Sequence, residues 1–226
     1  MTLSRRRFLA AAGATGAVGL AGCLGSSEEM PDGPVTQVSV PDSPGDYTYA
    51  TMGTGEEPLV TYIGNWKCPF CAAFSENYLR DIVSNYVEPG DLSLEYRDWP
   101  GLISEDDVNA VHAGLAVWEV DPETYWTYHE YVMVNQPSES ESWTTADRLA
   151  GFAESAGVSD PDAVRQAVEE EAYQEEVQAN QQYVQETGAG GTPAMVIDGS
   201  SYQAIGDREG NANPDVEEAL TALVEE

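Results

Sequence analysis

Apolar and polar positions along the chain first indicate a βαβ unit in the segment 59–97. The run 59–64 is almost wholly apolar, which is typical of a buried strand, and 92–97 alternates apolar with polar residues. Between them, residues 72–83 repeat apolar side chains with the 3.6-residue period of a helix. Strand, helix and strand in this order predict two parallel strands joined by a right-handed connection.

Two weaker patterns precede this unit. Residues 47–52 predict a strand that ends at a Gly-Thr-Gly turn, and the weak alternation of 35–40 predicts a short edge strand. The surrounding segment 24–46 is rich in Ser, Glu, Pro, Gly and Asp, a composition typical of a flexible tether. We therefore expect the main domain of the chain to begin at residue 47.

The middle of the chain, residues 102–187, is predicted to be almost entirely helical. Gly157 marks the end of one helix, and the long acidic stretch that follows is expected to break near Glu171 and to run to Thr187. The helix starts are marked by N-cap residues and prolines at Ser104, Pro122, Thr145, Asp160 and Pro161.

The remaining residues, 188–226, return to sheet. The strands 194–197 and 201–205 flank Asp198-Gly199, a strong signal for a tight hairpin turn. An Asn-Pro pair that ends at Pro214 then predicts the start of a last helix.

The N-terminal residues 1–23 predict a targeting segment. A basic start that includes Arg5 and Arg6 precedes an Ala/Gly-rich apolar run that is too short for a membrane span. Ser-Arg-Arg-x-Phe-Leu resembles the twin-arginine export motif, and Leu-Ala-Gly-Cys, which ends at Cys23, resembles a lipobox. These resemblances imply export in a folded state, cleavage before Cys23, and a lipid there that anchors the protein to the outer surface of the cell membrane. A plain secretory signal with a coincidental cysteine, or an uncleaved anchor, is the alternative.

Charge adds a further constraint. The chain has 40 acidic and 9 basic residues, and its formal net charge of −31 repels nucleic acid. Because the acids are spread along the whole chain, the pattern resembles that of proteins from salt-loving archaea. In molar salt the Debye length is about 3 Å, so that such a charge is largely screened. A functional acidic interaction surface is the alternative.

Two cysteines at the junction of the predicted strand and helix carry the candidate chemistry. Cys68, Pro69, Phe70 and Cys71 form a Cys-x-x-Cys motif, which at such a junction predicts a redox-active pair. The first turn of a helix has unpaired N–H groups and a positive dipole end, so it stabilises a thiolate. Pro69 suits this turn because its missing N–H would have no partner there. Lys67 adds a cation beside Cys68, which favours the thiolate.

The arrangement over residues 47–226 resembles the thioredoxin superfamily, and most closely its DsbA-like branch. The resemblance is carried by the Cys-Pro-x-Cys pair at a strand–helix junction and by a Gly-Thr-Pro before a strand about 120 residues later. It implies an α/β thioredoxin-like domain formed by 47–101 and 188–226 and interrupted by a helical insertion at 102–187. It implies no metal and no organic cofactor, because the redox centre is the cysteine pair itself.

The resemblance also implies roles for individual residues. Cys68 is expected to be the nucleophile, more exposed and lower in pKa than the resolving thiol Cys71, and Trp66 is expected to lie nearby. The reaction implied is dithiol–disulfide exchange with exported or cell-surface proteins, followed by recycling through a redox partner that the sequence does not identify. The substrate-binding residues implied are Pro69, Phe70, Thr192 and Pro193, with a cis peptide bond between the last two that faces the cysteines.

Phe70 departs from the best-known member of this branch, which has histidine between the proline and the second cysteine. Because Phe70 cannot donate a hydrogen bond to the thiolate, the pair is expected to be less oxidising, whereas Lys67 acts in the opposite direction. The direction of electron flow, as an oxidase, a reductase or an isomerase, therefore stays open.

Three other interpretations of the cysteine pair are also open. A permanent disulfide at a helix start is one, although so short a loop contributes little stability by chain entropy. A zinc site formed by Cys68, Cys71, His112 and His129 is another, although the spacing does not fit a compact finger. A non-catalytic peptide-binding or chaperone module on a thioredoxin-like scaffold is the third, because a fold does not determine a function.

Overall fold

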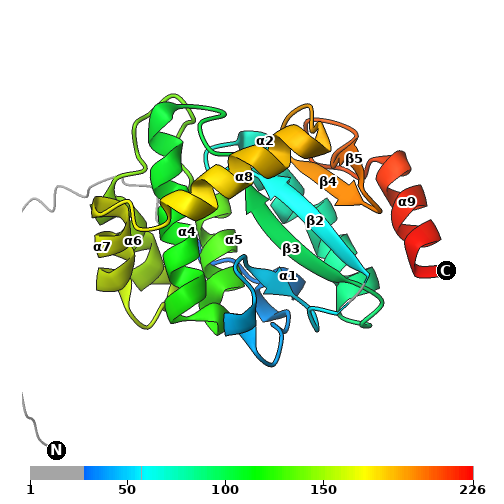
Figure 1. Ribbon diagram of the computed structural model, residues 1–226, viewed down its shortest axis with the longest axis horizontal. Helices are drawn as coiled ribbons and strands as arrows, with labels where there is room; N and C mark the ends of the chain where they lie inside the picture. The colour runs from blue at the N-terminus through cyan, green and yellow to red at the C-terminus, as the bar shows by residue number, and fades with distance from the viewer. Residues whose placement is uncertain (1–27, 57, 226) are drawn as a thin grey trace, which may run out of the picture.

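The computed structural model describes residues 28–56 and 58–225. The predicted targeting segment, with Arg5, Arg6 and Cys23, lies outside the described residues. A five-stranded mixed sheet has the strand order β1-β3-β2-β4-β5, and helix α8 crosses in front of it in Figure 1. The strands are β1 (Thr51–Met52), β2 (Leu59–Gly64), β3 (Ser93–Asp98), β4 (Ala194–Ile197) and β5 (Ser200–Gln203).

The predicted βαβ unit is confirmed. Strand β2 runs parallel to β3 along its whole length, from Leu59 opposite Ser93 to Gly64 opposite Asp98. On its other side, β2 pairs antiparallel with β4, and β4 pairs antiparallel with β5. The connection from β2 to β3 consists of α2 (Pro69–Glu76), α3 (Tyr78–Ile82) and a π-helical turn (Val83–Val87).

The predicted hairpin is also confirmed. Asp198 and Gly199 join β4 to β5, and both have positive φ values, of 44° and 71°. Such values are what a tight hairpin turn of matching twist requires, and Asp-Gly adopts them readily.

The helices of the insertion begin and end at the predicted signals. The Thr145 side chain accepts a hydrogen bond from the N–H of Arg148 and caps α6, which ends at Gly157 with φ of 87°. Asp160 caps α7 in the same way, and the chain breaks at Glu171, where φ is 49°. The helices are α4 (Val108–Val120), α5 (Tyr125–Asn135), α6 (Ala146–Ala156), α7 (Pro161–Glu169), α8 (Gln174–Thr187) and, after the sheet, α9 (Pro214–Glu225), with short 3-10 turns at Pro44–Asp46, Glu105–Asp107 and Pro122–Thr124.

The segment before the sheet differs from the expectation. The strand predicted over 35–40 is wrong, because Pro34–Gln37 forms the short helix α1, and Val35 is 1% exposed. The strand predicted over 47–52 is reduced to β1 (Thr51–Met52), which pairs with β3. The flexible tether expected over 24–46 is instead packed against the fold in its described part.

Apolar contacts and hydrogen bonds explain this packing. Val35 belongs to the main core cluster, and helix α1 contacts α5 and α3. Asn135 on α5 pairs with the main chain of Glu29 in both directions, at 2.7 Å each. A few buried side chains therefore outweigh a composition that is typical of flexible segments.

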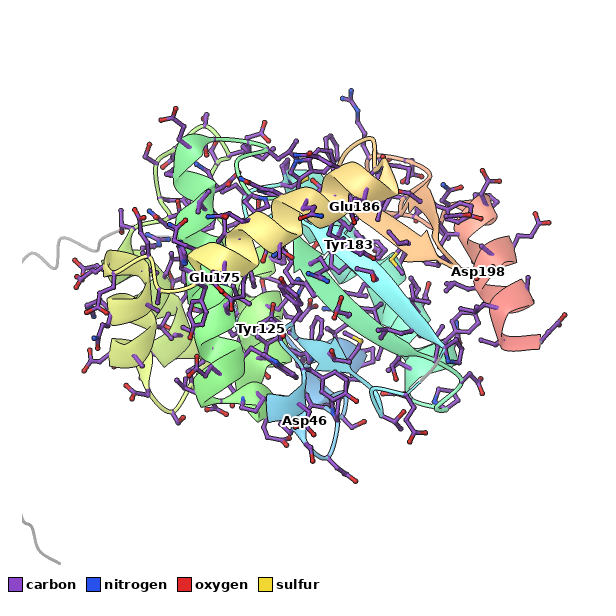
Figure 2. All side chains as sticks on the ribbon, in the orientation of Figure 1. Asp46, Tyr125, Glu175, Tyr183, Glu186 and Asp198 are labelled. Carbon is purple, nitrogen blue, oxygen red and sulfur yellow. The ribbon has the colours of Figure 1, made fainter. Side chains whose placement is uncertain are left out.

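Helix α8 is held to the sheet by one aromatic and one basic side chain. The Tyr183 hydroxyl donates to Thr61 Oγ1 at 2.9 Å, and the Arg97 guanidinium lies 4.6 Å from the Tyr183 ring and 3.6 Å from the Tyr49 ring. Glu175 and Glu186 lie along the same helix in Figure 2. Both are exposed and lie on the solvent side of α8, while its inner side packs on β3.

The core of the sheet continues into the insertion around Trp66. This side chain is 1% exposed and meets Tyr96 of β3 and His129 of α5 with ring centroids at 5.5 and 5.4 Å. Within the part of the chain that the structure describes, no helix has the length and apolarity needed to cross a membrane.

Gly114 tests how tightly Trp66 is packed. An added Cβ would lie 2.7 Å from Trp66 Cζ2, whereas a Cβ on Gly151 in α6 meets nothing within 4 Å. We expect Gly114→Ala to lower the free energy of unfolding by roughly 1–3 kcal/mol through overpacking. Gly151→Ala, the matched control, should raise it by roughly 0.5–1 kcal/mol through helix propensity. Denaturant unfolding measures both, and stabilisation by Gly114→Ala would show that Trp66 can move aside.

Candidate active site

The Cys-x-x-Cys motif lies where β2 ends and α2 begins. Cys68 is the N-cap residue of α2, and Pro69 occupies the first position of the helix. The Cys68 carbonyl accepts from the N–H groups of Cys71 and Ala72 at 3.1 and 3.2 Å, which begins the helix. Both cysteines are free thiols in this structure.

The two thiols have opposite pKa shifts. A hydrogen bond from Cys71 lowers the pKa of Cys68 to about 6; burial opposes this, and Thr192 and the N–H groups of Cys71 and Phe70 assist it. Burial raises the pKa of Cys71 well above its ordinary value, and the neighbouring Cys68 sulfur raises it further. Cys68 is therefore the sulfur that is a thiolate near neutral pH, and Cys71 stays protonated.

The expected difference in exposure is small. Cys68 is 2% exposed and Cys71 is completely buried. The thiolate character of Cys68 thus comes from hydrogen bonds at the helix start and not from contact with solvent.

The loop before β4 closes over the sulfur of Cys68. The Thr192–Pro193 peptide bond is cis, as the resemblance implied, and the Cys68 thiol lies 3.5 Å from the Thr192 carbonyl oxygen. The Pro193 carbonyl accepts from Ala204 N–H at 3.0 Å and from Gln203 Nε2 at 2.7 Å, which ties this loop to the far end of β5. The structure therefore places Thr192 and Pro193 against the cysteine pair.

Phe70 is turned outward beside the pair. Its side chain is 38% exposed, and among the described residues only Met30 is a comparably exposed large apolar side chain. Exposed aromatic surface next to a reactive thiol can contact a polypeptide that brings its own cysteine to Cys68.

Lys67 is bound by groups of the insertion. Its ammonium group donates to Ser104 Oγ at 2.8 Å, to the Asp106 carboxylate at 3.0 Å and to the Glu141 carbonyl at 2.8 Å. The cation expected beside Cys68 is therefore paired with Asp106, and Lys67 is not among the main causes of the lowered pKa of Cys68.

The sequence reasoning missed a buried polar cluster beneath the pair. The Tyr62 hydroxyl faces Cys71 without a hydrogen-bond partner at normal distance. The Glu130 carboxylate accepts from Ser75 Oγ and lies 3.1 Å from His129 Nδ1. Ser75 lies one turn after Cys71 on α2, so its spacing in the sequence could have indicated a shared helix face. Glu130 lies on α5 of the insertion, and no spacing in the sequence connects it to the cysteines.

A second buried acid lies at the end of β3. Asp98 accepts a hydrogen bond from the Tyr96 hydroxyl at 3.0 Å, but burial dominates and raises its pKa to about 8. No pattern in the sequence distinguished this acid from the many exposed ones.

His112 and His129 have different hydrogen-bond partners. His112 Nδ1 accepts from the N–H of Tyr173 at 3.1 Å, and burial lowers its pKa. His129 pairs with Glu130. Among residues 28–56 and 58–225, no group of three or more His, Cys, Asp or Glu side chains is arranged to hold a metal ion.

Comparisons with known proteins agree with this geometry. The family model described as Thioredoxin matches residues 52–225. The curated Disulfide bond formation protein D of Bacillus subtilis is 23% identical over 147 residues, which cover 65% of this chain and 66% of that protein, just under two thirds of its length. A probable disulfide bond formation protein D of Bacillus cereus is 23% identical over 79% of each chain.

Solved structures show the same fold. The crystal structure of oxidised BdbD from Bacillus subtilis has a TM-score of 0.70 and 20% identity, covering 84% of this chain and 99% of that one. DsbA from Chlamydia trachomatis has a TM-score of 0.64 and 22% identity, covering 77% of this chain and 91% of that one. The predicted thioredoxin-like fold with a helical insertion is thereby confirmed.

The hydrogen bond from Cys71 predicts how Cys68 titrates. The ultraviolet absorbance of the thiolate in the reduced protein should rise with a midpoint near pH 6, because Cys71 donates to the Cys68 sulfur. Cys71→Ala removes this donor and should move the midpoint toward the ordinary value of about 8.5. Cys71→Ser is the matched variant, since its hydroxyl can still donate. An unchanged midpoint in Cys71→Ala would contradict this account.

Asp98 predicts a pH-dependent stability. Its pKa of about 8 in the folded protein exceeds its unfolded value, so that folding takes up a proton. The contribution is therefore complete below the unfolded pKa of about 4 and is lost as the pH rises through about 8. Asp98→Asn should flatten the fall in the free energy of unfolding between about pH 5 and about pH 8 in denaturant titrations. Exposed Asp91→Asn is the control, and an equal slope in both variants would assign the titration elsewhere.

Proposed function

Because the chain belongs to the thioredoxin family, we propose that it is a thiol–disulfide oxidoreductase that exchanges disulfides with exported or cell-surface proteins through Cys68 and Cys71. The observation that carries the proposal is the unequal pair of thiols, with the pKa of Cys68 lowered to about 6 and that of buried Cys71 raised. A structural disulfide does not require one of its sulfurs to be a stabilised thiolate, whereas exchange chemistry does.

In the oxidising direction the enzyme starts as the Cys68–Cys71 disulfide. A substrate thiolate attacks the Cys68 sulfur, a mixed disulfide forms, and Cys71 leaves and takes up a proton. A second substrate thiolate then attacks the substrate sulfur of the mixed disulfide, which releases an oxidised substrate and the Cys68 thiolate. A low pKa makes Cys68 a good leaving group in this last step.

In the reducing or isomerising direction the same residues act in reverse order. The Cys68 thiolate attacks a substrate disulfide, and Cys71 loses its proton and resolves the mixed disulfide. No metal or organic cofactor takes part in either sequence, since electrons pass only between sulfur atoms.

The lowered pKa supports an intermediate redox character. The pKa of the attacking thiol in this chemistry ranges from about 3.5 in the strong oxidant DsbA to about 7 in the reductant thioredoxin. A Cys68 pKa of about 6 lies between them. Phe70, which offers no hydrogen bond to the thiolate, supports a potential less oxidising than that of DsbA.

The proposed setting is the outer surface of the cell membrane, in high salt. The twin-arginine motif at Arg5 and Arg6 and the lipobox at Cys23 support export and lipid anchoring, and the net charge of −31 supports a saline environment. With Cys23 lipidated, Cys68 and Cys71 would be the two cysteines of the sequence whose thiols remain available for exchange. The pair would be recycled by a membrane or extracellular redox partner.

The substrates would be proteins with accessible thiols or disulfides. Exposed Phe70 and the Thr192–Pro193 loop support binding of an extended segment, because both adjoin the Cys68 sulfur. Pro69 shapes the same surface by starting α2.

Mixed-disulfide trapping tests the proposal. In Cys71→Ser the resolving thiol is missing, so that substrates should accumulate as covalent complexes on Cys68, visible on non-reducing gels of membrane fractions. Cys68→Ser is the matched control and should trap little, because Cys71 is buried and protonated. Absence of complexes in Cys71→Ser would favour a non-catalytic peptide-binding or chaperone module. Equilibration of the wild-type pair with glutathione in molar salt then gives the direction of electron flow.

A further inference from the structure

Lys67 is buried although it carries a charge and directly precedes the reactive cysteine. Its side chain is 1% exposed, and its donors reach Ser104 Oγ, both oxygens of Asp106 and the Glu141 carbonyl at 2.8 to 3.2 Å. An ammonium group has three N–H donors, and here three partners receive them. A buried charge in such a position is retained only with a complete set of partners.

The three partners come from two separate segments of the insertion. Ser104 and Asp106 lie where the chain enters the insertion, before α4. Glu141 lies in the loop 136–144, which together with the N-cap residue Thr145 connects α5 to α6. Lys67 therefore joins the end of β2 to both segments at once.

The loop 136–144 is held at both of its ends. At its start, Gln136 Nε2 lies 3.5 Å from the Cys68 carbonyl oxygen. At its end, Thr144 Oγ1 donates to the main chain and carboxylate of Asp106 at 2.6 and 2.9 Å, and Asn109 donates to the Thr144 carbonyl at 2.9 Å. Between these ends, residues 138–142 are exposed, and the Lys67–Glu141 hydrogen bond ties this part to the residue that directly precedes Cys68.

The charges around Lys67 indicate that this residue holds the loop in place and does not activate the Cys68 thiol. Burial is the largest single effect and raises the pKa of Asp106, but hydrogen bonds from Ser104, Lys67 and Thr144 together with the Lys67 charge outweigh it and lower the pKa to about 2. The ammonium charge is thus paired with a carboxylate that remains ionised throughout the neutral range, and neither group is among the main causes of the lowered pKa of Cys68.

The loop matters for substrate binding because it begins beside Cys68, whose sulfur the substrate must reach. Because the Cys68 side chain is 2% exposed, a protein whose thiol reaches its sulfur must also contact the residues around it. Those surroundings include Thr192, at 3.5 Å from the sulfur, exposed Phe70, and Gln136 at the start of the loop. A small thiol such as glutathione needs far less of this surface than a polypeptide does.

We propose that Lys67 is a positioning residue that holds the loop 136–144 beside Cys68 as one wall of the protein-substrate site. Phe70, Thr192 and Pro193 form the rest of this site. The inference rests on the proposed function, and it names the surface that receives the substrate polypeptide.

Kinetics with two substrates of different size test the inference. Lys67→Met keeps the apolar stem of the side chain and removes its charge and donors. With a reduced, unfolded protein as substrate, KM should rise about tenfold with kcat little changed, whereas exchange with glutathione and the thiolate midpoint of Cys68 stay as in the wild type. Hydrogen exchange of the amides in 138–144 should become faster. Arg165→Met, which removes one charge from an exposed ion pair with Asp147 on the far helices, is the control and should change none of these.

Two results would overturn the inference. If the Cys68 midpoint rises and the rates with glutathione and with protein fall equally, Lys67 acts on the thiol and not on the loop. If KM for the protein substrate is unchanged, the loop is no part of the substrate site. Should Lys67→Met not fold, Gln136→Ala removes the loop contact with the Cys68 carbonyl and should raise the same KM. A wild-type protein that exchanges with no protein thiol would overturn the proposed function as well, whereas an unchanged KM in an active Lys67→Met overturns only this inference.

Discussion

The unequal protonation of two adjacent thiols is the constraint on which the site depends. Burial alone raises the pKa of a thiol, because the charged form loses its hydration, and both sulfurs are buried. Cys68 is the exception because it caps α2, where the Cys71 thiol and backbone N–H groups donate to it. Cys71, one turn further along, keeps the burial penalty. A helix start and a dry interior thus assign different chemistry to two otherwise identical side chains.

Two neighbouring residues fasten this arrangement to the helical insertion by different forces. Trp66 packs between aromatic rings of β3 and α5, so that it contributes apolar contact. Lys67 uses an ion pair and hydrogen bonds to Asp106 and the 136–144 loop. The sheet and the insertion are therefore joined immediately before Cys68 by the apolar packing of Trp66 and by the polar contacts of Lys67. The position of the reactive sulfur depends on both parts of the chain.

Local signals account for what could be predicted of the fold. The cap at Asp160, the left-handed end at Gly157 and the Asp198-Gly199 turn act through neighbours in sequence, and each lies where it was expected. The segment 24–46 was not predictable in this way. Its polar composition concealed Val35, whose burial against α5 comes from tertiary packing.

The sequence by itself determined the strand–helix junction, the cysteine pair on it, the parallel strands of the βαβ unit and the last hairpin, because these follow from short-range periodicity, caps and turns. Only the tertiary structure decided which groups surround the sulfurs. Thr192 reaches Cys68 across 124 residues of sequence, and Lys67 donates to partners 37 to 74 residues away along the chain. The physical reason is that hydrogen bonds and burial depend on distance in space, which packing sets and spacing along the chain does not.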